Sequence, residues 1–296
     1  MTLNMLIEKA VKQSKKTIAV AAADDEEVML AIAEAIKADL ANFHLYGNAE
    51  TISIMMKKYN LTSNDQIKVY DAVGADAARL AVQAVSSGNA DIVMKGNIST
   101  AIILKAVLNK EYGLRTGNVL SHVAVFEVPN YNRLITVTDA AMNIAPDLEG
   151  KTAILKNAVH VVRAIGIEKP KVAPLAAVEL VNPAMQATVD AALLTQMNRR
   201  GQIKDCIVDG PLAFDNAVSS IAAAHKGIVS EVAGEADILL VPDIEAGNIL
   251  YKSLVYFANA KVGAIVAGAK APIVLTSRAD TAEAKLYSLA LAVATA

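Results

Sequence analysis

The sequence of residues 17–38 is TIAVAAADDEEVMLAIAEAIKA, a short apolar run followed by a segment of helical length. The apolar run stops at Asp24-Asp25, and from Glu26 onward the apolar side chains recur at spacings of three and four. The first pattern is typical of a buried strand and the second of an amphipathic helix. This stretch therefore predicts a strand over residues 17–23 and a helix over residues 26–38.

The same strand–helix unit repeats through the first third of the chain. Further strands are predicted at residues 42–46, 67–73 and 90–94, and further helices at residues 50–59, 75–86 and 100–108. Strands and helices that alternate in this way build α/β folds, in which helices cover both faces of a parallel sheet.

The alternation breaks where strands at residues 122–128 and 133–138 are joined by Pro129-Asn130-Tyr131-Asn132, a connection that predicts an antiparallel hairpin. It then resumes with strands at 172–178, 203–208, 236–241, 262–266 and 273–275, and helices at 148–165, 184–197, 246–258 and 281–294. We expect a two-domain α/β fold with parallel and mixed sheets. Residues 1–120 with 266–296 would form the first domain, and residues 121–265 the second.

Composition argues against several classes of protein. The 296 residues are 54% hydrophobic and carry a net charge of −2, so the chain has no general attraction to nucleic acid or to an anionic membrane. No apolar run approaches the ~20 residues that span a bilayer. The start of the chain lacks the apolar segment of a signal peptide. We therefore expect a cytoplasmic protein with neither a nucleic-acid nor a membrane partner.

Cysteine and histidine give no sign of a metal site or a catalytic thiol. The single cysteine, Cys206, lies in an apolar strand-like run and is expected to be a small buried side chain. The four histidines are scattered, with no pair at metal-ligand spacing. Neither a Gly-x-Ser-x-Gly nucleophile elbow nor a Gly-x-Gly-x-x-Gly dinucleotide fingerprint is present.

Residues 272–280, PIVLTSRAD, are predicted to form a strand-to-helix turn that combines a hydroxyl, a guanidinium and a carboxylate. Ligands of α/β proteins bind at the carboxyl ends of strands. Here the Ser277 hydroxyl can donate to a reacting group, and the Arg278 guanidinium can hold an anion through two N–H groups. The pair suits a substrate that carries phosphate, and a reaction in which negative charge develops on an oxygen.

Residues 95–100, KGNIST, close one strand and open a helix. Gly96 permits a tight turn, and Asn97 or Ser99 can cap the helix that starts at Thr100. The free amides of the first helical turn, together with Lys95, can form an anion site. The alternative is an ordinary capped helix with a solvated lysine. The cations that follow, Lys105, Lys110 and Arg115, either lie over a phosphate group or form a solvated surface.

Polar residues also follow three strands in the second half of the chain. Asp139 and Asn143 follow the second hairpin strand, where they either shape a turn or reach a ligand. Asp209 and the cluster Asp243, Glu245 and Asn248 follow two further strands. The carboxylates of the Asp243–Glu245 cluster could bind a divalent metal, but helix capping is the preferred interpretation.

Four motifs in this order resemble the phosphate acetyl/butyryltransferase family. They are residues 139–143 (DAAMN), 208–212 (VDGPL), 241–252 (VPDIEAGNILYK) and 275–278 (LTSR). The run Pro-Asp-x-x-Ala-Gly-Asn-Ile-x-Tyr-Lys is the most specific. The short chain, KGNIST and Ser277-Arg278-Ala279-Asp280-Thr281 resemble the butyryl branch more than the acetyl branch.

The resemblance implies a fold, a reaction and an assembly. The fold would be related to the isocitrate and isopropylmalate dehydrogenases, with the active site in a cleft between two domains, and the protein would be a homodimer or a higher homo-oligomer. The reaction would be butyryl-CoA + phosphate ⇌ butyryl phosphate + CoA. Coenzyme A and phosphate would be small-molecule substrates, with no metal, no prosthetic group and no covalent acyl-enzyme.

The resemblance also assigns roles to residues. Ser277 would donate to the developing oxyanion or to the thiolate, and Arg278 would hold the phosphoryl oxygens. The acetyl branch has an Asp, thought to be the thiol base, seven residues after the serine; that position is Ala284 here, so Glu283 or Asp280 would have to replace it. The second phosphate-binding arginine of the acetyl branch aligns near Lys105, with Arg115 as an alternative. Further phosphate- or CoA-binding candidates are Lys95, Asn97, Ser99, Thr100, Asp139, Asn143, Asp243 and Asn248.

Three other functions stay open at this point. The chain could be a phosphate acetyltransferase, or a NAD- and metal-dependent hydroxy-acid dehydrogenase with Asp209, Asp243 and Glu245 as metal ligands. It could also be a non-catalytic acyl-CoA binding protein, which Ala284 would favour.

Overall fold

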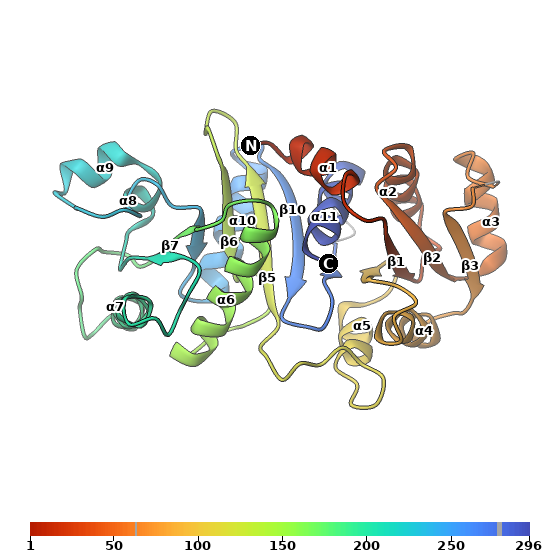
Figure 1. The fold of residues 1–296 in the computed structure, drawn as a ribbon, viewed down its shortest axis with the longest axis horizontal. Coiled ribbons are helices and arrows are strands. Elements are labelled where there is room, and N and C mark those ends of the chain that lie inside the picture. The colour runs from red at the N-terminus through yellow and green to blue at the C-terminus, as the bar shows by residue number, and fades with distance from the viewer. Residues whose placement is uncertain (63, 277–279) are drawn as a thin grey trace. The chain divides into compact units, whose positions relative to one another are not determined.

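The computed structural model describes residues 1–62, 64–276 and 280–296 and has an α/β fold. The chain divides into two compact units. The terminal unit comprises Leu3–Asn118 and Val262–Ala296; the central unit comprises Val119–Lys261 with Met1–Thr2. In Figure 1 the terminal unit runs from red to yellow and returns in dark blue, and the central unit runs from yellow-green to light blue.

The terminal unit contains a mixed sheet with strand order β3-β2-β1-β4-β11-β10. Its strands are β1 (Lys16–Ala21), β2 (Ala41–Gly47), β3 (Ile67–Asp71), β4 (Ile92–Lys95), β10 (Lys261–Ala267) and β11 (Ile273–Val274). The first five in the spatial order pair in parallel, and β10 is antiparallel to β11.

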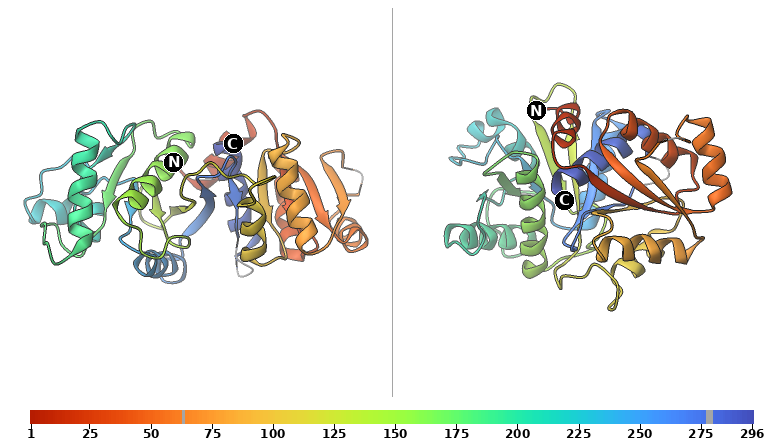
Figure 2. Two further views of the ribbon diagram at one scale, coloured as in Figure 1. Left: turned by 90° about the horizontal axis from the view of Figure 1, so that it is seen from below. Right: turned by 45° about the vertical axis from the view of Figure 1, so that its right-hand side comes forward.

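Helices cover both faces of this sheet, as the alternation predicts. Two of them, α4 (Ala75–Ser86) and α5 (Thr100–Val107), pack together on one face. The other face carries α1 (Leu3–Val11), α2 (Glu26–Lys37), α3 (Ala49–Lys58) and α11 (Ala282–Thr295). The right-hand view of Figure 2 shows the two groups on either side of the strands. Helix α2 begins where expected because the Asp25 carboxylate accepts a hydrogen bond from the amide of Val28.

The strands of the central unit follow the order β5-β6-β9-β7-β8 and include both parallel and antiparallel pairs. Its strands are β5 (Ser121–Glu127), β6 (Leu134–Thr138), β7 (Lys171–Pro174), β8 (Ile207–Val208) and β9 (Ile238–Leu240). The predicted hairpin is confirmed, because β5 and β6 pair antiparallel. The helices are α6 (Leu148–Ala164), α7 (Gln186–Arg199), α8 (Phe214–Val218), α9 (Ser220–His225) and α10 (Ile244–Tyr256).

Several predicted boundaries are wrong, and local contacts explain one of them. Helices α1, α8 and α9 were not predicted, and β7 and β8 are shorter than residues 172–178 and 203–208. Residues before β8 leave the strand because the Asn198 side-chain amide donates to the carbonyl oxygens of Ile203 and Cys206. An apolar run alone does not show that a side chain will take the backbone hydrogen bonds that a neighbouring strand would otherwise make.

Within residues 1–62, 64–276 and 280–296, no helix is both long enough and apolar enough to cross a membrane.

The fold makes a prediction about Gly96, which follows β4. A Cβ atom at this position would lie 2.0 Å from the carbonyl oxygen of Ala22 and 2.8 Å from that of Ala21. Gly96→Ala would force two backbones apart, and we expect it to lower the free energy of unfolding by ~2 kcal/mol. Gly47→Ala is the milder comparison, since a Cβ there meets the ends of the Asp24 and Ile52 side chains at 2.9 Å, which can rotate away, and the backbone nitrogen of Ala23 only at 3.2 Å. Denaturant unfolding of both variants measures the difference; equal losses would contradict the prediction.

Candidate active site

The carboxyl ends of β1, β4 and β11 lie side by side in the terminal unit. From β1 the chain adds β2 and β3 on one side and β4 on the other, so the strand order reverses between β1 and β4. In open α/β sheets this switch point is where ligands bind. The segment that begins at Lys95 therefore occupies the favoured position for a site.

The backbones at this switch point are in close contact. The amide of Gly96 donates to the carbonyl oxygen of Ala21 at 2.8 Å, and the amide of Asn97 donates to that of Ala22 at 2.7 Å. Ala22 has a φ of 56°, in the left-handed region that costs a non-glycine residue ~1 kcal/mol or more. Backbone strain of this kind is common at functional sites. These contacts fix the turn between β4 and α5.

Lys95 is buried, with 7% of its surface exposed, so the alternative of a solvated lysine is wrong. Its Nζ donates to the carbonyl oxygens of Gly96 at 3.1 Å and Ile98 at 3.3 Å. A buried ammonium interacts with an approaching anion more strongly than a solvated one does, because water screens it less. Lys95 thus adds positive potential at the carboxyl ends of these strands.

The other candidates of this segment, Asn97, Ser99 and Thr100, are all exposed. Ser99 caps α5 by accepting a hydrogen bond from the amide of Ile102. The α5 amides from Thr100 onward thus begin next to the switch point and can bind an anion. Lys105 on α5 and Arg115 in the following loop are both exposed. Their contact with a substrate stays a prediction.

The serine–arginine pair, Ser277 and Arg278, lies outside the described residues. Before it, β11 pairs in parallel with β4, and Val274 lies opposite Met94. After it, the carbonyl oxygen of Asp280 accepts a hydrogen bond from the Nζ of Lys285. Lys285 is only 2% exposed, and sequence reasoning missed it. The available signal was a lysine at the start of the apolar stretch 285–294 (KLYSLALAVA).

Glu283, a candidate base, lies in the first turn of α11 and is exposed. The hydroxyl of Tyr287 lies 3.0 Å from its carboxylate and 2.9 Å from Oδ1 of Asn4. Its single hydrogen can serve one of these acceptors at a time. Glu283 is thus partly committed to contacts at the α1–α11 interface, and its role as a base stays a prediction.

In the central unit, the Asp139 carboxylate organises its own turn. It is buried and accepts hydrogen bonds from the amides of Ala141, Met142 and Asn143 at 2.9, 3.0 and 3.1 Å, and from Nδ2 of Asn143 at 2.6 Å. Nδ2 of Asn143 also donates to the carbonyl oxygen of Leu120. Any action of Asp139 on a ligand would therefore pass through the shape of the 139–143 turn.

The 241–252 motif packs directly against that turn. Asp243 caps α10 by accepting from the amide of Ala246 at 2.8 Å, as expected for a helix entrance. Nδ2 of Asn248 donates to the carbonyl oxygen of Ala140 at 3.3 Å. A Cβ at Gly247 would lie 2.6 Å from the carbonyl oxygen of Asp139, so the close approach requires glycine. The structure thus unites two motifs that are about a hundred residues apart in sequence.

The carboxylates of the dehydrogenase alternative do not meet. Asp209 follows β8 and Asp243 follows β9, and β7 lies between these strands. Two strand spacings separate the strand ends by roughly 10 Å. Asp209 instead lies 3.7 Å from the guanidinium of Arg199. In the part of the chain that the structure describes, no group of three or more His, Cys, Asp and Glu side chains is placed to hold a metal.

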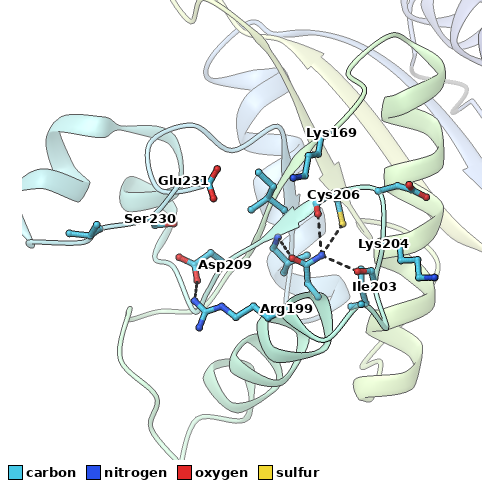
Figure 3. Close-up of a pocket in the computed structure, with 14 residues that line it drawn as sticks. Lys169, Arg199, Ile203, Lys204, Cys206, Asp209, Ser230 and Glu231 are labelled. Carbon is cyan, nitrogen blue, oxygen red and sulfur yellow. Dashed lines mark hydrogen bonds and ion pairs between the residues drawn. The ribbon is translucent and has the colours of Figure 1, made fainter.

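A cavity of about 840 Å³ borders β8, the edge strand of the central unit, and Figure 3 shows its lining. Charges of both signs face it, among them Lys169, Lys204, Asp209 and Glu231. Burial, with a smaller contribution from Asp205, raises the pKa of the Cys206 thiol to about 11. The thiol is therefore protonated at neutral pH, which makes it a poor nucleophile.

Comparison with known proteins identifies the family. A family model described as "Phosphate acetyl/butaryl transferase" matches residues 71–293. The chain is 59% identical over 297 residues to a probable phosphate butyryltransferase of Bacillus subtilis (strain 168), covering 99% of this chain and 97% of that protein. The chain belongs to the phosphate acetyl/butaryl transferase family. It is also 50% identical to a phosphate butyryltransferase of Clostridium acetobutylicum, covering 98% of this chain and 97% of that protein.

The fold agrees with that of a solved phosphotransacylase. The crystal structure of a branched-chain phosphotransacylase from Enterococcus faecalis V583 matches with a TM-score of 0.84 at 37% identity, covering 95% of this chain and 98% of that one. The family match spans the switch-point segment and both central-unit motifs. The sites described above are thus parts of a phosphate acetyl/butaryl transferase.

The hydrogen bonds of Asp139 predict how a matched pair of variants behaves. Asp139→Asn would turn an NH₂ group toward N–H donors whichever way the amide is placed, and we expect a loss of ~2 kcal/mol in the free energy of unfolding. Asp243→Asn should be nearly neutral, because asparagine is an equally good N-cap. Thermal or urea unfolding of both proteins gives the comparison. A loss for Asp243→Asn as large as that for Asp139→Asn would refute this account of the turn.

Proposed function

We propose that this acyltransferase converts butyryl-CoA and phosphate into butyryl phosphate and CoA. The relatives named phosphate butyryltransferase support the choice of acyl group. The structural observation that carries the proposal is the switch point of the terminal unit. There the buried ammonium of Lys95 and the amino end of α5 lie beside the strand that leads to Ser277-Arg278.

In the proposed reaction, a phosphate oxygen attacks the thioester carbonyl of butyryl-CoA within a ternary complex. Negative charge develops on the carbonyl oxygen, and the Ser277 hydroxyl donates to it or to the departing thiolate. Arg278 holds the phosphoryl oxygens through its paired N–H groups. In the reverse direction the CoA thiol loses its proton before it attacks, and Glu283 or Asp280 is the proposed acceptor. CoA takes part as a substrate, and the proposal assigns no step to a metal or prosthetic group.

We propose roles for the remaining residues around these groups. Lys95, Asn97, Ser99 and Thr100, with Lys105 or Arg115, would bind phosphate or the phosphates of CoA, because cations and helix-terminal amides favour anions. The turns that contain Asp139, Asn143, Asp243 and Asn248 would shape the surface that meets CoA. The relation of the fold to the isocitrate and isopropylmalate dehydrogenases, the domain boundaries, the location of the active site and the cytoplasmic location stay predictions.

We further propose that two copies associate through α10. In this thirteen-residue helix Gly247 is the only buried residue, although the sequence is rich in apolar side chains. Ile249, Tyr256 and the following Phe257 are exposed, Phe257 by 88%. Exposed apolar patches of this kind mark interaction sites, and a second copy would bury both patches at once around a twofold axis.

Thiol release from a panel of acyl-CoAs, with and without phosphate and in the presence of a chelator, tests the proposed reaction. We expect release that requires phosphate and is fastest with four-carbon chains. A maximum at two carbons would instead identify a phosphate acetyltransferase. Tight binding of acyl-CoA without release would identify a binding protein.

The serine–arginine pair gives a second prediction. Ser277→Ala and Arg278→Ala should each lower kcat/KM at least about tenfold, which corresponds to ~1.4 kcal/mol of lost transition-state stabilisation. Ser14→Ala and Arg200→Ala remove the same groups from exposed positions and should leave kcat/KM unchanged. Full activity in both Ser277→Ala and Arg278→Ala would remove these residues from the mechanism.

The proposed interface predicts the behaviour of α10 variants in sedimentation velocity. The double variant Ile249→Glu/Phe257→Glu should be monomeric at micromolar concentration, because four carboxylates would face one another across the interface. Ile221→Glu changes an equally exposed isoleucine on α9 and should leave the dimer intact. A wild-type protein that sediments as a monomer, or a double variant that stays dimeric, would disprove the interface.

A further inference from the structure

A cavity of about 900 Å³ lies wholly within the terminal unit, on the face of the sheet that carries α4. Its floor is formed by His44 and Tyr46 of β2 and Tyr70 of β3, and Gln83 of α4 lines one side. Ser87 and Asn89, which precede β4, also line it. Lys95, at the carboxyl end of β4, and residues 96–100 do not line it, so the cavity is distinct from the switch point.

Topology explains why this part of the sheet is open. Helix α4 packs on β1, β2 and β4, and α5 packs beside it, while β3 is the edge strand. The parallel register places Tyr46 beside Tyr70 and His44 beside Lys68, so these four side chains share one face. Tyr70 is left 38% exposed as a result.

The aromatic rings on this floor are ordered. Tyr46 and Tyr70 stack with centroids 4.8 Å apart and planes 12° apart. The His44 ring meets Tyr70 edge-on at 5.4 Å. Rings held in this way present a fixed flat surface, and planar heteroaromatic molecules stack on such surfaces without losing further side-chain freedom.

Polar groups line the cavity beside the rings. Oε1 of Gln83 accepts from Arg79, which leaves the NH₂ group of that amide as a donor. Nδ2 of Asn89 donates to the Ser87 hydroxyl, which leaves Oδ1 of Asn89 as an acceptor. Amide donors and acceptors complement the edge of a purine, and hydroxyls complement a ribose.

His44 contributes its ring to the cavity floor. Its Nδ1 has no hydrogen-bond partner in the structure, but the atom is buried and is therefore not exposed to a ligand in the cavity. Burial, helped by the charge of Lys68, lowers the pKa of His44, so the imidazole is neutral at pH 7. Lys68 and Glu111, both at the cavity, oppose one another in charge, which favours an uncharged ligand.

We propose that this cavity is a binding site for a purine nucleoside, with the base stacked on the Tyr70 ring. The proposal is independent of the acyltransferase reaction. CoA itself carries an adenosine group, so the test must separate binding in this cavity from binding of adenosine in place of CoA.

Isothermal titration of the full-length protein with adenosine tests the proposal. We expect saturable binding, one adenosine per chain, with a Kd below about 1 mM. Tyr70→Ala should weaken binding about tenfold, and Tyr70→Phe, which keeps the flat ring, should retain it. Tyr59→Ala removes a tyrosine of the terminal unit that does not line the cavity and should have no effect.

Two further measurements distinguish binding in this cavity from binding of adenosine in place of CoA. With saturating CoA present, adenosine should bind with unchanged affinity, and the KM for CoA should be the same in Tyr70→Ala as in the wild type. Absence of saturable binding, displacement of adenosine by CoA, or equal binding to Tyr70→Ala and wild type would each overturn the proposal.

Discussion

The close backbone approach at the end of β1 and β4 is the constraint on which the terminal unit depends. Parallel strands that diverge from a switch point leave a gap at their carboxyl ends. Here hydrogen bonds from Gly96 and Asn97 to the carbonyl groups of Ala21 and Ala22 fix the turn beside that gap, and a side chain at residue 96 would prevent them. The left-handed conformation of Ala22 is part of the same arrangement. The unfavourable backbone conformation of Ala22 is thus part of the set of contacts that fixes the turn into α5.

Two lysine ammonium groups of the terminal unit are held by backbone carbonyl groups. Lys95 lies at the end of a buried strand and bends back to the carbonyl groups of its own turn, and Lys285 binds the carbonyl group of Asp280. Both ammonium groups are almost entirely buried. Burying a charge is unfavourable unless something compensates it, and carbonyl dipoles contribute to that compensation. Positive potential held at the carboxyl ends of these strands favours an anion, which is the physical basis for proposing phosphate as a ligand of this unit.

In the central unit, the Asp139 carboxylate has a structural role that requires no contact with a substrate. Asp139 receives four hydrogen bonds from the turn that follows it, and Gly247 lets α10 approach the backbone of that turn. Asp243 caps the same helix. The motifs most characteristic of the family therefore describe a packed structural element, in which an aspartate satisfies backbone donors that would otherwise be buried without partners.

The sequence by itself determined the features that depend on neighbours along the chain. Strand–helix alternation and the 129–132 hairpin connection follow from periodicity and turn composition. The caps Ser99 and Asp243 follow from side chains that bond the amide three residues further on. The motifs were likewise sufficient to indicate the family. Only the tertiary structure decided that Lys95 is buried, that Asn198 ends the run before β8, and that Tyr46 lies beside Tyr70. These outcomes depend on strand order, register and packing between distant segments, and the residue types at those positions carry no local signal of them.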